Sequence, residues 1–145
     1  MSPKIDFYIS QGSTNEQRLL LACRLADKAF RSGHAVHVHC ADAAQAQQLD
    51  DLLWSFQATS FVPHAQVHSD DAANAPVRIG HGAALWLNND VLINLDRAVP
   101  AAFAQYARVL EVVVQDSVVL DNTREHWRHY KQLGHEPQRR ELANA

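Results

Sequence analysis

The sequence predicts one α/β domain: a three-layer sandwich with a mostly parallel central sheet and helices on both faces. Short apolar segments alternate with amphipathic ones along the chain, which is typical of strands and helices in alternation. Residues 90–95 and 109–114 are nearly continuous apolar runs, as in strands that are buried on both faces. A chain of 145 residues without repeats or linkers fits a single core.

The first part of the chain predicts a strand, a helix and a second strand. Apolar residues alternate with polar ones over 5–9, which predicts the first strand. Ser13 or Thr14, each followed three residues later by Glu or Gln, predicts a capping box for a helix that runs to Arg31. Alternation resumes over 34–40 and predicts the next strand.

Asp42 begins a second predicted helix. Residues 53–64 cover the end of this helix and the loop after it. That stretch places a tryptophan, two phenylalanines and a proline at the helix end and in the next loop. Loops normally run over the surface, so large apolar residues here either fill the core or wait for a partner. Residues 66–75 are polar and predict a mobile loop.

The second half of the chain predicts strands over 77–79, 90–95 and 109–114, with a short helix that begins at Pro100.

The last predicted helix starts at a cap formed by Asp121 or Asn122 and runs to Leu133. The domain is accordingly predicted to span residues 1–136. Residues 137–145 then form a polar C-terminal tail, which we expect to fray.

Charge and cysteine usage narrow the class of protein. The net charge is −3 and the pI about 6.3, which disfavours nucleic-acid binding through the whole surface. We expect no signal peptide and no membrane span. Cys23 and Cys40 form no CxxC motif and are expected to fill core space. The simplest interpretation is a reduced, cytoplasmic protein.

Motifs for catalysis and for nucleotide binding are missing. A Rossmann-like order of elements would carry a glycine-rich phosphate loop in its first strand-to-helix turn. Residues 9–15 hold one glycine and no lysine, so no nucleotide-binding loop is predicted. The sequence also has neither GxSxG nor HExxH. We predict no catalytic residues and no cofactor, with a small nucleotide- or phosphate-handling enzyme as the alternative.

The histidines raise the question of a metal site. His34, His37 and His39 lie close together in sequence, and two or three imidazoles could hold a metal, but such a site usually also uses carboxylates or thiolates. The simpler interpretation places them on the less buried side of a strand. His126 and His129 are one helical turn apart and are expected on the solvent side of the last helix. No metal site is predicted.

Four residues of the last helix share one face: Arg124, Trp127, Arg128 and Lys131. An aromatic ring among cations suits an acidic partner that brings an apolar side chain or a terminal carboxylate. The same face would also suit single-stranded DNA, through stacking and charge. Alternatively, Trp127 packs inward while the cationic side chains cover the edge of the helix.

The apolar stretch has a similar ambiguity. Leu53 and Phe56 complete the inward face of the second helix, and Trp54 points away from it. Phe61 and Pro63 lie beyond the helix end. These residues either fold back on the core or remain exposed together as a partner interface.

Further segments carry a family resemblance. They are Phe7-Tyr8, Arg31-Ser32-Gly33, Leu49-Asp50, Leu53-Trp54, the segment 60–64, Ala75-Pro76-Val77, the segment 90–95 and the Tyr130…Gly134 ending. In this order and spacing they resemble the chi subunit of bacterial DNA polymerase III holoenzyme. The resemblance covers nearly the whole chain, and Phe-Val-Pro-His with its upstream Leu-Trp is its most specific part.

The resemblance implies a non-catalytic subunit of the clamp-loader assembly. Chi subunits pair one-to-one with the psi subunit and grip the acidic C-terminal tail of single-stranded DNA-binding protein, so contact with nucleic acid would be indirect. By resemblance, Trp54, Phe61 and Pro63 would form the psi-binding surface.

The same resemblance implies that Val113, Arg124 and Trp127 line the tail site, with Arg128 as a supporting cation. Two positions depart from the family pattern. Leu120 stands where the family has a lysine, and Trp127 stands where a tyrosine is familiar. Arg128 or Lys131 is a candidate for the missing charge.

Overall fold

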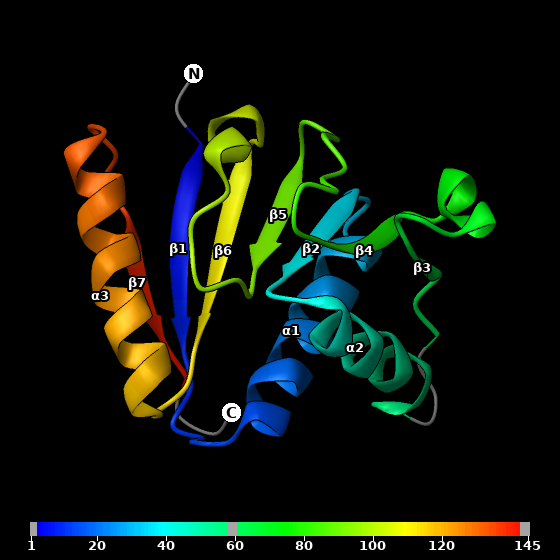
Figure 1. Cartoon of the computed structure of the whole chain (residues 1–145), viewed down its shortest axis with the longest axis horizontal. Helices are drawn as coiled ribbons and strands as arrows, with labels where there is room; N and C mark the ends of the chain where they lie inside the picture. The colour runs from blue at the N-terminus through cyan, green and yellow to red at the C-terminus, as the bar shows by residue number, and fades with distance from the viewer. Residues whose placement is uncertain (1–2, 58–60, 143–145) are drawn as a thin grey trace.

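The computed structural model describes residues 3–57 and 61–142, and its described strands form one parallel sheet of seven (Figure 1). The strand order is β3-β4-β2-β5-β6-β1-β7, so β3 and β7 are the two edges. The strands are β1 Lys4–Ile9, β2 Val36–Cys40, β3 His64–Gln66, β4 Val77–His81, β5 Val91–Asn94, β6 Arg108–Val113 and β7 Gln138–Glu141.

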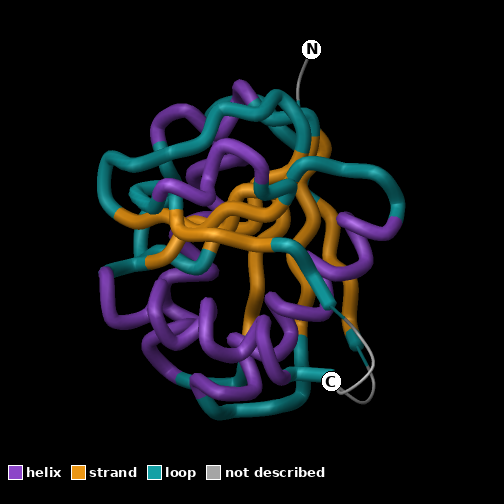
Figure 2. The backbone as a smooth tube through the Cα atoms, turned by 90° about the vertical axis from the view of Figure 1, so that its right-hand side faces the viewer, coloured by secondary structure: helices purple, strands orange, loops and turns teal. Residues whose placement is uncertain are grey.

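Helices cover both faces of the sheet, so the predicted three-layer sandwich is confirmed. Helices α1, Asn15–Arg31, and α2, Ala43–Ser55, pack on one face, and α3, Ser117–Gln132, packs on the other. In Figure 2 the strands form a layer between helical segments. Two short 3-10 helices, η1 Asp70–Asn74 and η2 Ala101–Gln105, complete the described elements. No described helix is long and apolar enough to cross a lipid bilayer.

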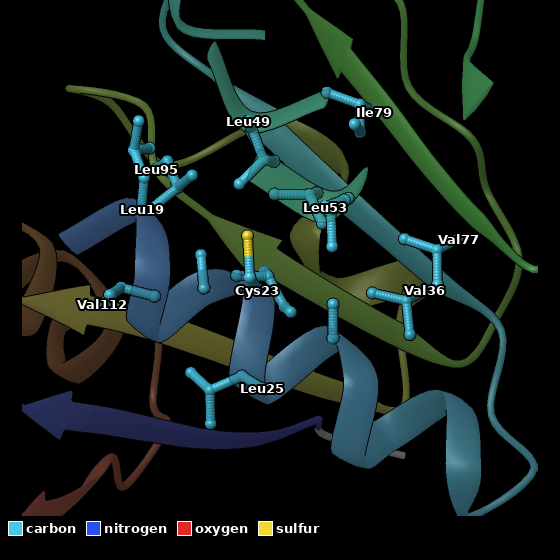
Figure 3. Packing of buried hydrophobic residues seen from close by; sticks show 14 of the residues in the cluster. Leu19, Cys23, Leu25, Val36, Leu49, Leu53, Val77, Ile79, Leu95 and Val112 are labelled. Carbon is cyan, nitrogen blue, oxygen red and sulfur yellow. The ribbon is translucent and has the colours of Figure 1, made fainter. Parts of the chain in front are cut away.

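The larger core lies between the sheet and the first two helices (Figure 3). Alternation along β2 points Val36 and Val38 at these helices. Cys23 and Cys40 are both fully buried there, as predicted. Burial raises the pKa of each thiol to about 12, because the thiolate would lose its hydration. Both cysteines therefore act as small apolar side chains.

The opposite face carries a second core beneath α3. Phe7 of β1 contacts the rings of Trp127 and Tyr130, with centroid distances of 5.2 Å and 5.9 Å. Phe103 of η2 packs edge-on against Tyr130 at 5.1 Å. These aromatic contacts fix where α3 lies over β1 and β6.

A buried carboxylate holds α3 to the sheet. Glu111 of β6 accepts hydrogen bonds from the Tyr130 hydroxyl at 2.6 Å, the Asn94 amide at 3.0 Å and His126 Nδ1 at 2.9 Å. His126 Nε2 donates to the carbonyl oxygen of Arg97 at 2.8 Å. The Arg97 carbonyl oxygen can only accept, so Nε2 carries a proton, and the carboxyl group of Glu111 beside Nδ1 favours the protonated ring.

The predicted helix starts are correct for two of three helices. Thr14 forms the capping box with Gln17, and Asp42 caps α2 by accepting from the Gln45 N–H. The predicted cap of the last helix at Asp121 or Asn122 is wrong. Asp116 caps α3 instead, because the apolar residues 118–120 belong to the helix and not to the preceding apolar run.

Weakly patterned segments also form structure. The predicted mobile loop over 66–75 contains η1, and β3 precedes it. The predicted frayed tail is wrong for Gln138–Glu141, which pairs in parallel with β1. Such pairing uses backbone groups, so an exposed polar strand leaves little apolar pattern to detect.

The histidine positions differ from the prediction. His37 and His39 are buried, because the chain after β4 crosses their face of the sheet. This segment passes so close that a Cβ on Gly80 would lie 2.3 Å from the Ala84 carbonyl oxygen. Burial, with a contribution from His39, lowers the pKa of His37 to about 3, so that ring is neutral. His126 is buried rather than solvent-facing. Among the described residues, no group of three or more His, Cys, Asp or Glu could hold a metal ion.

The His126–Glu111 pair makes stability pH-dependent. Burial alone would lower the pKa of His126, but the hydrogen bond and charge of Glu111 outweigh burial and raise it. The pair therefore stabilises the fold fully below the unfolded pKa, near 6.5, and this contribution is lost as the pH rises through the higher folded pKa.

We expect the unfolding free energy of the native chain to fall over that range, relative to that of His126→Gln. Urea denaturation across a pH series measures both. Parallel pH profiles would contradict a raised pKa of His126.

Candidate functional site

Trp54 and Phe61 lie exposed beside each other on the surface near the end of α2. Each has 60% of its surface accessible, and their ring centroids are 5.6 Å apart. Half-buried Pro63 follows. We call Trp54, Phe61 and Pro63 the apolar patch. The alternative that these residues fold back on the core is wrong for the two aromatic rings, although residues 58–60 of this stretch lie outside the described part of the chain.

The backbone under the apolar patch is anchored on both sides. Leu53 and Val62 are essentially fully buried in the larger core. One residue further along α2 rotates the side chain by about 100°, which turns Trp54 away from that core. The exposure of the patch therefore follows from the packing of its neighbours.

His64 supports the patch from below. Its Nδ1 donates to the Val62 carbonyl oxygen at 2.6 Å, and its ring lies 4.8 Å from that of Trp54. Its side chain is fully covered, with Nε2 3.3 Å from an Asp50 carboxylate oxygen. Burial raises the pKa of Asp50, an effect that His64 opposes. The Trp54 ring therefore packs on an imidazole that hydrogen bonding holds in place.

A groove with a volume of about 900 Å³ lies between α3 and β7, with β1 as its floor. All four residues of the predicted tail site line it, and Leu120 and Lys131 lie with them. These four are Val113, Arg124, Trp127 and Arg128. The structure therefore brings together residues that are separated in sequence.

Trp127 both packs inward and belongs to the surface proposed for a partner, which were the two interpretations of its sequence pattern. Its ring packs against Phe7 in the second core, yet it is only half-buried and also lines the groove. Arg124 is 65% exposed and donates to Asp121 at 2.9 Å. Exposed ion pairs of this kind contribute little stability, so Arg124 can exchange Asp121 for another carboxylate.

The groove is strongly basic in a chain of net negative charge. Its lining holds one carboxylate, Glu141, and the cations Arg124, Arg128, Lys131 and Arg139. Arg139 was not predicted as a groove residue, because residues 137–145 were expected to fray. The residues of β7 are exposed and polar, so no apolar pattern indicates a strand here.

The first strand-to-helix turn is poorly suited to phosphate. Three of its N–H groups already have acceptors: Gly12 donates to Ser10 Oγ at 2.9 Å, while Ser13 and Thr14 donate to Gln17 Oε1 at 2.8 Å and 3.1 Å. A phosphate loop needs such groups free to cradle the anion.

The carboxyl ends of the central strands are also occupied. Arg18 of α1 donates to the carbonyl oxygens of Val112 at 2.9 Å and Leu95 at 3.2 Å. Burial lowers the pKa of Arg18. Open α/β sheets usually bind small ligands at these strand ends. Here a side chain of the protein fills that position.

These features define a class: an α/β domain that exposes an apolar patch and a basic groove and lacks the glycine-rich phosphate loop in its first strand-to-helix turn. The family model described as DNA polymerase III chi subunit, HolC, matches residues 2–138. The chain belongs to the DNA polymerase III chi subunit family.

Relatives named DNA polymerase III subunit chi support the assignment. The protein from Pseudomonas aeruginosa is 39% identical over 132 residues, covering 91% of this chain and 92% of its own. That from Haemophilus influenzae is 30% identical over 134 residues, covering 92% and 91%. That from Escherichia coli is 29% identical over 133 residues, covering 88% and 90%.

Proposed function

We propose that this chain is a non-catalytic subunit of the DNA polymerase III clamp-loader assembly in the bacterial cytoplasm. It bridges the psi subunit to the acidic C-terminal tail of single-stranded DNA-binding protein during DNA replication. One observation carries the proposal: two surfaces of different chemistry lie near opposite edges of the sheet. The apolar patch adjoins β3, and the basic groove adjoins β7. These two strands are the opposite edges of the sheet (Figure 1).

The apolar patch suits a lasting partner such as psi. Aromatic side chains supply large contact areas with few rotatable bonds, and they dominate the energetics of many interfaces. Trp54 and Phe61 are already positioned by buried neighbours, so little side-chain freedom is lost when a partner covers them. A 1:1 complex with psi would remove both rings from water.

The basic groove suits a peptide that ends in an apolar residue with a free carboxylate. Arg124 would bind the carboxylate through charge-assisted, bidentate hydrogen bonds. Val113 and Trp127 offer an apolar surface beside it. Each contact is exposed, so binding should weaken as salt rises. Several tails on an oligomeric binding protein would offset a modest single-site affinity.

The psi interface is tested by Trp54→Ala combined with Phe61→Ala. We expect the double variant to lose co-purification with psi while its thermal unfolding midpoint stays close to that of the native chain, because both rings are exposed. Psi retained by the folded double variant would contradict this interface.

The tail site is tested by Arg124→Ala. We expect affinity for an acidic tail peptide to fall about tenfold or more, as for the loss of a charge-assisted contact. Isothermal titration calorimetry measures the change. Asp121→Asn, which removes the internal partner of Arg124, should bind at least as tightly as the native chain. Unchanged affinity in Arg124→Ala would exclude Arg124 as the anchor.

Direct binding of single-stranded DNA is the rival use of the same groove. A binding protein that lacks its C-terminal tail separates the two. Recruitment of the chain to DNA coated with the tail-deleted protein would favour direct DNA contact, whereas tail recognition predicts its loss.

A further inference from the structure

A small pocket lies on the α1 side of the sheet, between the last turns of α1 and the first residues of β5 and β6. Its volume is about 100 Å³. That is the space of about three water molecules, so the pocket can hold one small group but not a whole nucleotide or a peptide. It shares no lining residue with the basic groove or with the apolar patch.

The polar lining of the pocket consists of groups that can donate hydrogen bonds. Its permanently charged side chains are Lys28 and Arg108, and no carboxylate lines it in the described part of the chain. Tyr8 and Ser32 add hydroxyl groups, and His34 adds an imidazole. In a chain of net charge −3, this composition is a local concentration of positive charge.

Hydrogen bonds to the sheet hold Arg108 in place. Its Nε and Nη2 donate to Asp6 Oδ2 at 3.2 Å and 3.1 Å, and Nη2 also donates to the Tyr8 hydroxyl oxygen at 2.6 Å. Asp6 is fully buried and accepts from Arg140 Nε at 3.1 Å as well. One carboxylate thus serves two guanidinium groups, which leaves one positive charge over. Because the Tyr8 oxygen accepts from Arg108, its own proton can be donated to a ligand in the pocket.

The carboxylates close to the pocket in sequence already have partners. Asp27 accepts from Arg31 Nε at 2.8 Å, and Asp90 accepts from His34 Nδ1 at 2.9 Å. The Ala35 N–H donates to the other oxygen of Asp90 at 2.9 Å. These contacts offset the negative charges nearest to the pocket in sequence, so the cations of the pocket lining remain available to a ligand.

The end of α1 is the one feature that opposes an anion, because a helix C-terminus carries partial negative charge. The fold weakens this effect. The carbonyl oxygens of Lys28, Ala29 and Phe30 already accept hydrogen bonds from the N–H groups of residues 32–34. Apolar side chains form the remaining wall, namely Leu25, Ala29, Val91 and Leu110. Such a wall keeps water away and strengthens the attraction between a bound anion and the two cations.

We propose that this pocket binds a single phosphate group, which is held by Lys28, Arg108 and the hydroxyl groups of Tyr8 and Ser32. A phosphate group presents several acceptor oxygens and negative charge, which match charged and neutral donors around a small space. The inference does not depend on tail binding, because the pocket and the groove lie on opposite faces of the sheet. Free phosphate and the backbone of single-stranded DNA both present this group, and the test separates these two sources.

The test compares Lys28→Gln with Arg24→Gln. Arg24 is an exposed cation one turn earlier on α1 and does not line the pocket. The probes are inorganic phosphate and a single-stranded oligothymidylate without terminal phosphates, with sodium chloride at the same ionic strength as the reference. Amide chemical shifts in two-dimensional NMR spectra give the dissociation constant of each probe, and thermal unfolding checks that both variants fold.

We expect the native chain to bind at least one probe saturably. The affinity should fall about fivefold or more in Lys28→Gln and stay within about twofold in Arg24→Gln. Lys28-dependent binding of phosphate alone identifies free phosphate as the source, whereas tighter, Lys28-dependent binding of the oligothymidylate identifies the DNA backbone. Shifts that rise linearly with both probes would overturn the pocket as a binding site. So would equal affinities of Lys28→Gln and the native chain.

Tyr8→Phe and Ser32→Ala separate a built pocket from a general surface charge. Each substitution removes one hydroxyl group and leaves both cations in place. We expect each to weaken binding about twofold or more, as for the loss of one hydrogen bond to a charged group. Unchanged affinity in both variants would also overturn the proposal, since Lys28 would then act only as a charge on the surface.

Discussion

Glu111 lies on β6 beneath α3, and the geometry of the groove depends on its buried carboxylate. A buried charge is costly unless it is paired and hydrogen-bonded, and Glu111 receives bonds from His126, Tyr130 and Asn94. Two of these donors belong to α3. A rotation or a slide of the helix would break their bonds, so the network specifies one position for α3. The exposed side chains Arg124 and Arg128 take their places from this constraint.

The parallel sheet adds a second constraint, because it keeps the two surfaces apart. Its edges are β3, which continues from the apolar patch, and β7, which walls the groove. Five strands lie between these edges in the described sheet. Two partners bound to these surfaces would not compete for space. This separation explains how a small domain without a phosphate loop could serve as a physical link.

Patterns of apolar and capping residues in the sequence predicted most of the fold. Buried strands such as β5 and β6 leave apolar runs, and helix caps such as Thr14 and Asp42 have local signatures. The residues predicted for the tail site include Arg124 and Trp127, which share a detectable helical spacing. Strand β7 had no such signal, because its residues are exposed and its partner strand lies far away in sequence. Arg139 was missed for that reason.

Burial of polar residues was harder to foresee. His37 and His126 look like surface residues on their own elements, and only tertiary contacts bury them. Glu111 meets His126 from another element and raises its pKa, whereas burial lowers the pKa of His37 to about 3. Helical spacing predicted that Trp54 points away from the core. Only the three-dimensional structure shows that its side chain stays largely exposed.

The central claim is that one chain holds two partners at once through independent surfaces. The most direct measurement is the affinity of the acidic tail peptide for the free chain and for its purified complex with psi. Independent surfaces predict the same dissociation constant in both, within about twofold, since no coupling free energy links the sites. Displacement of the peptide by psi, or of psi by the peptide, would contradict the account.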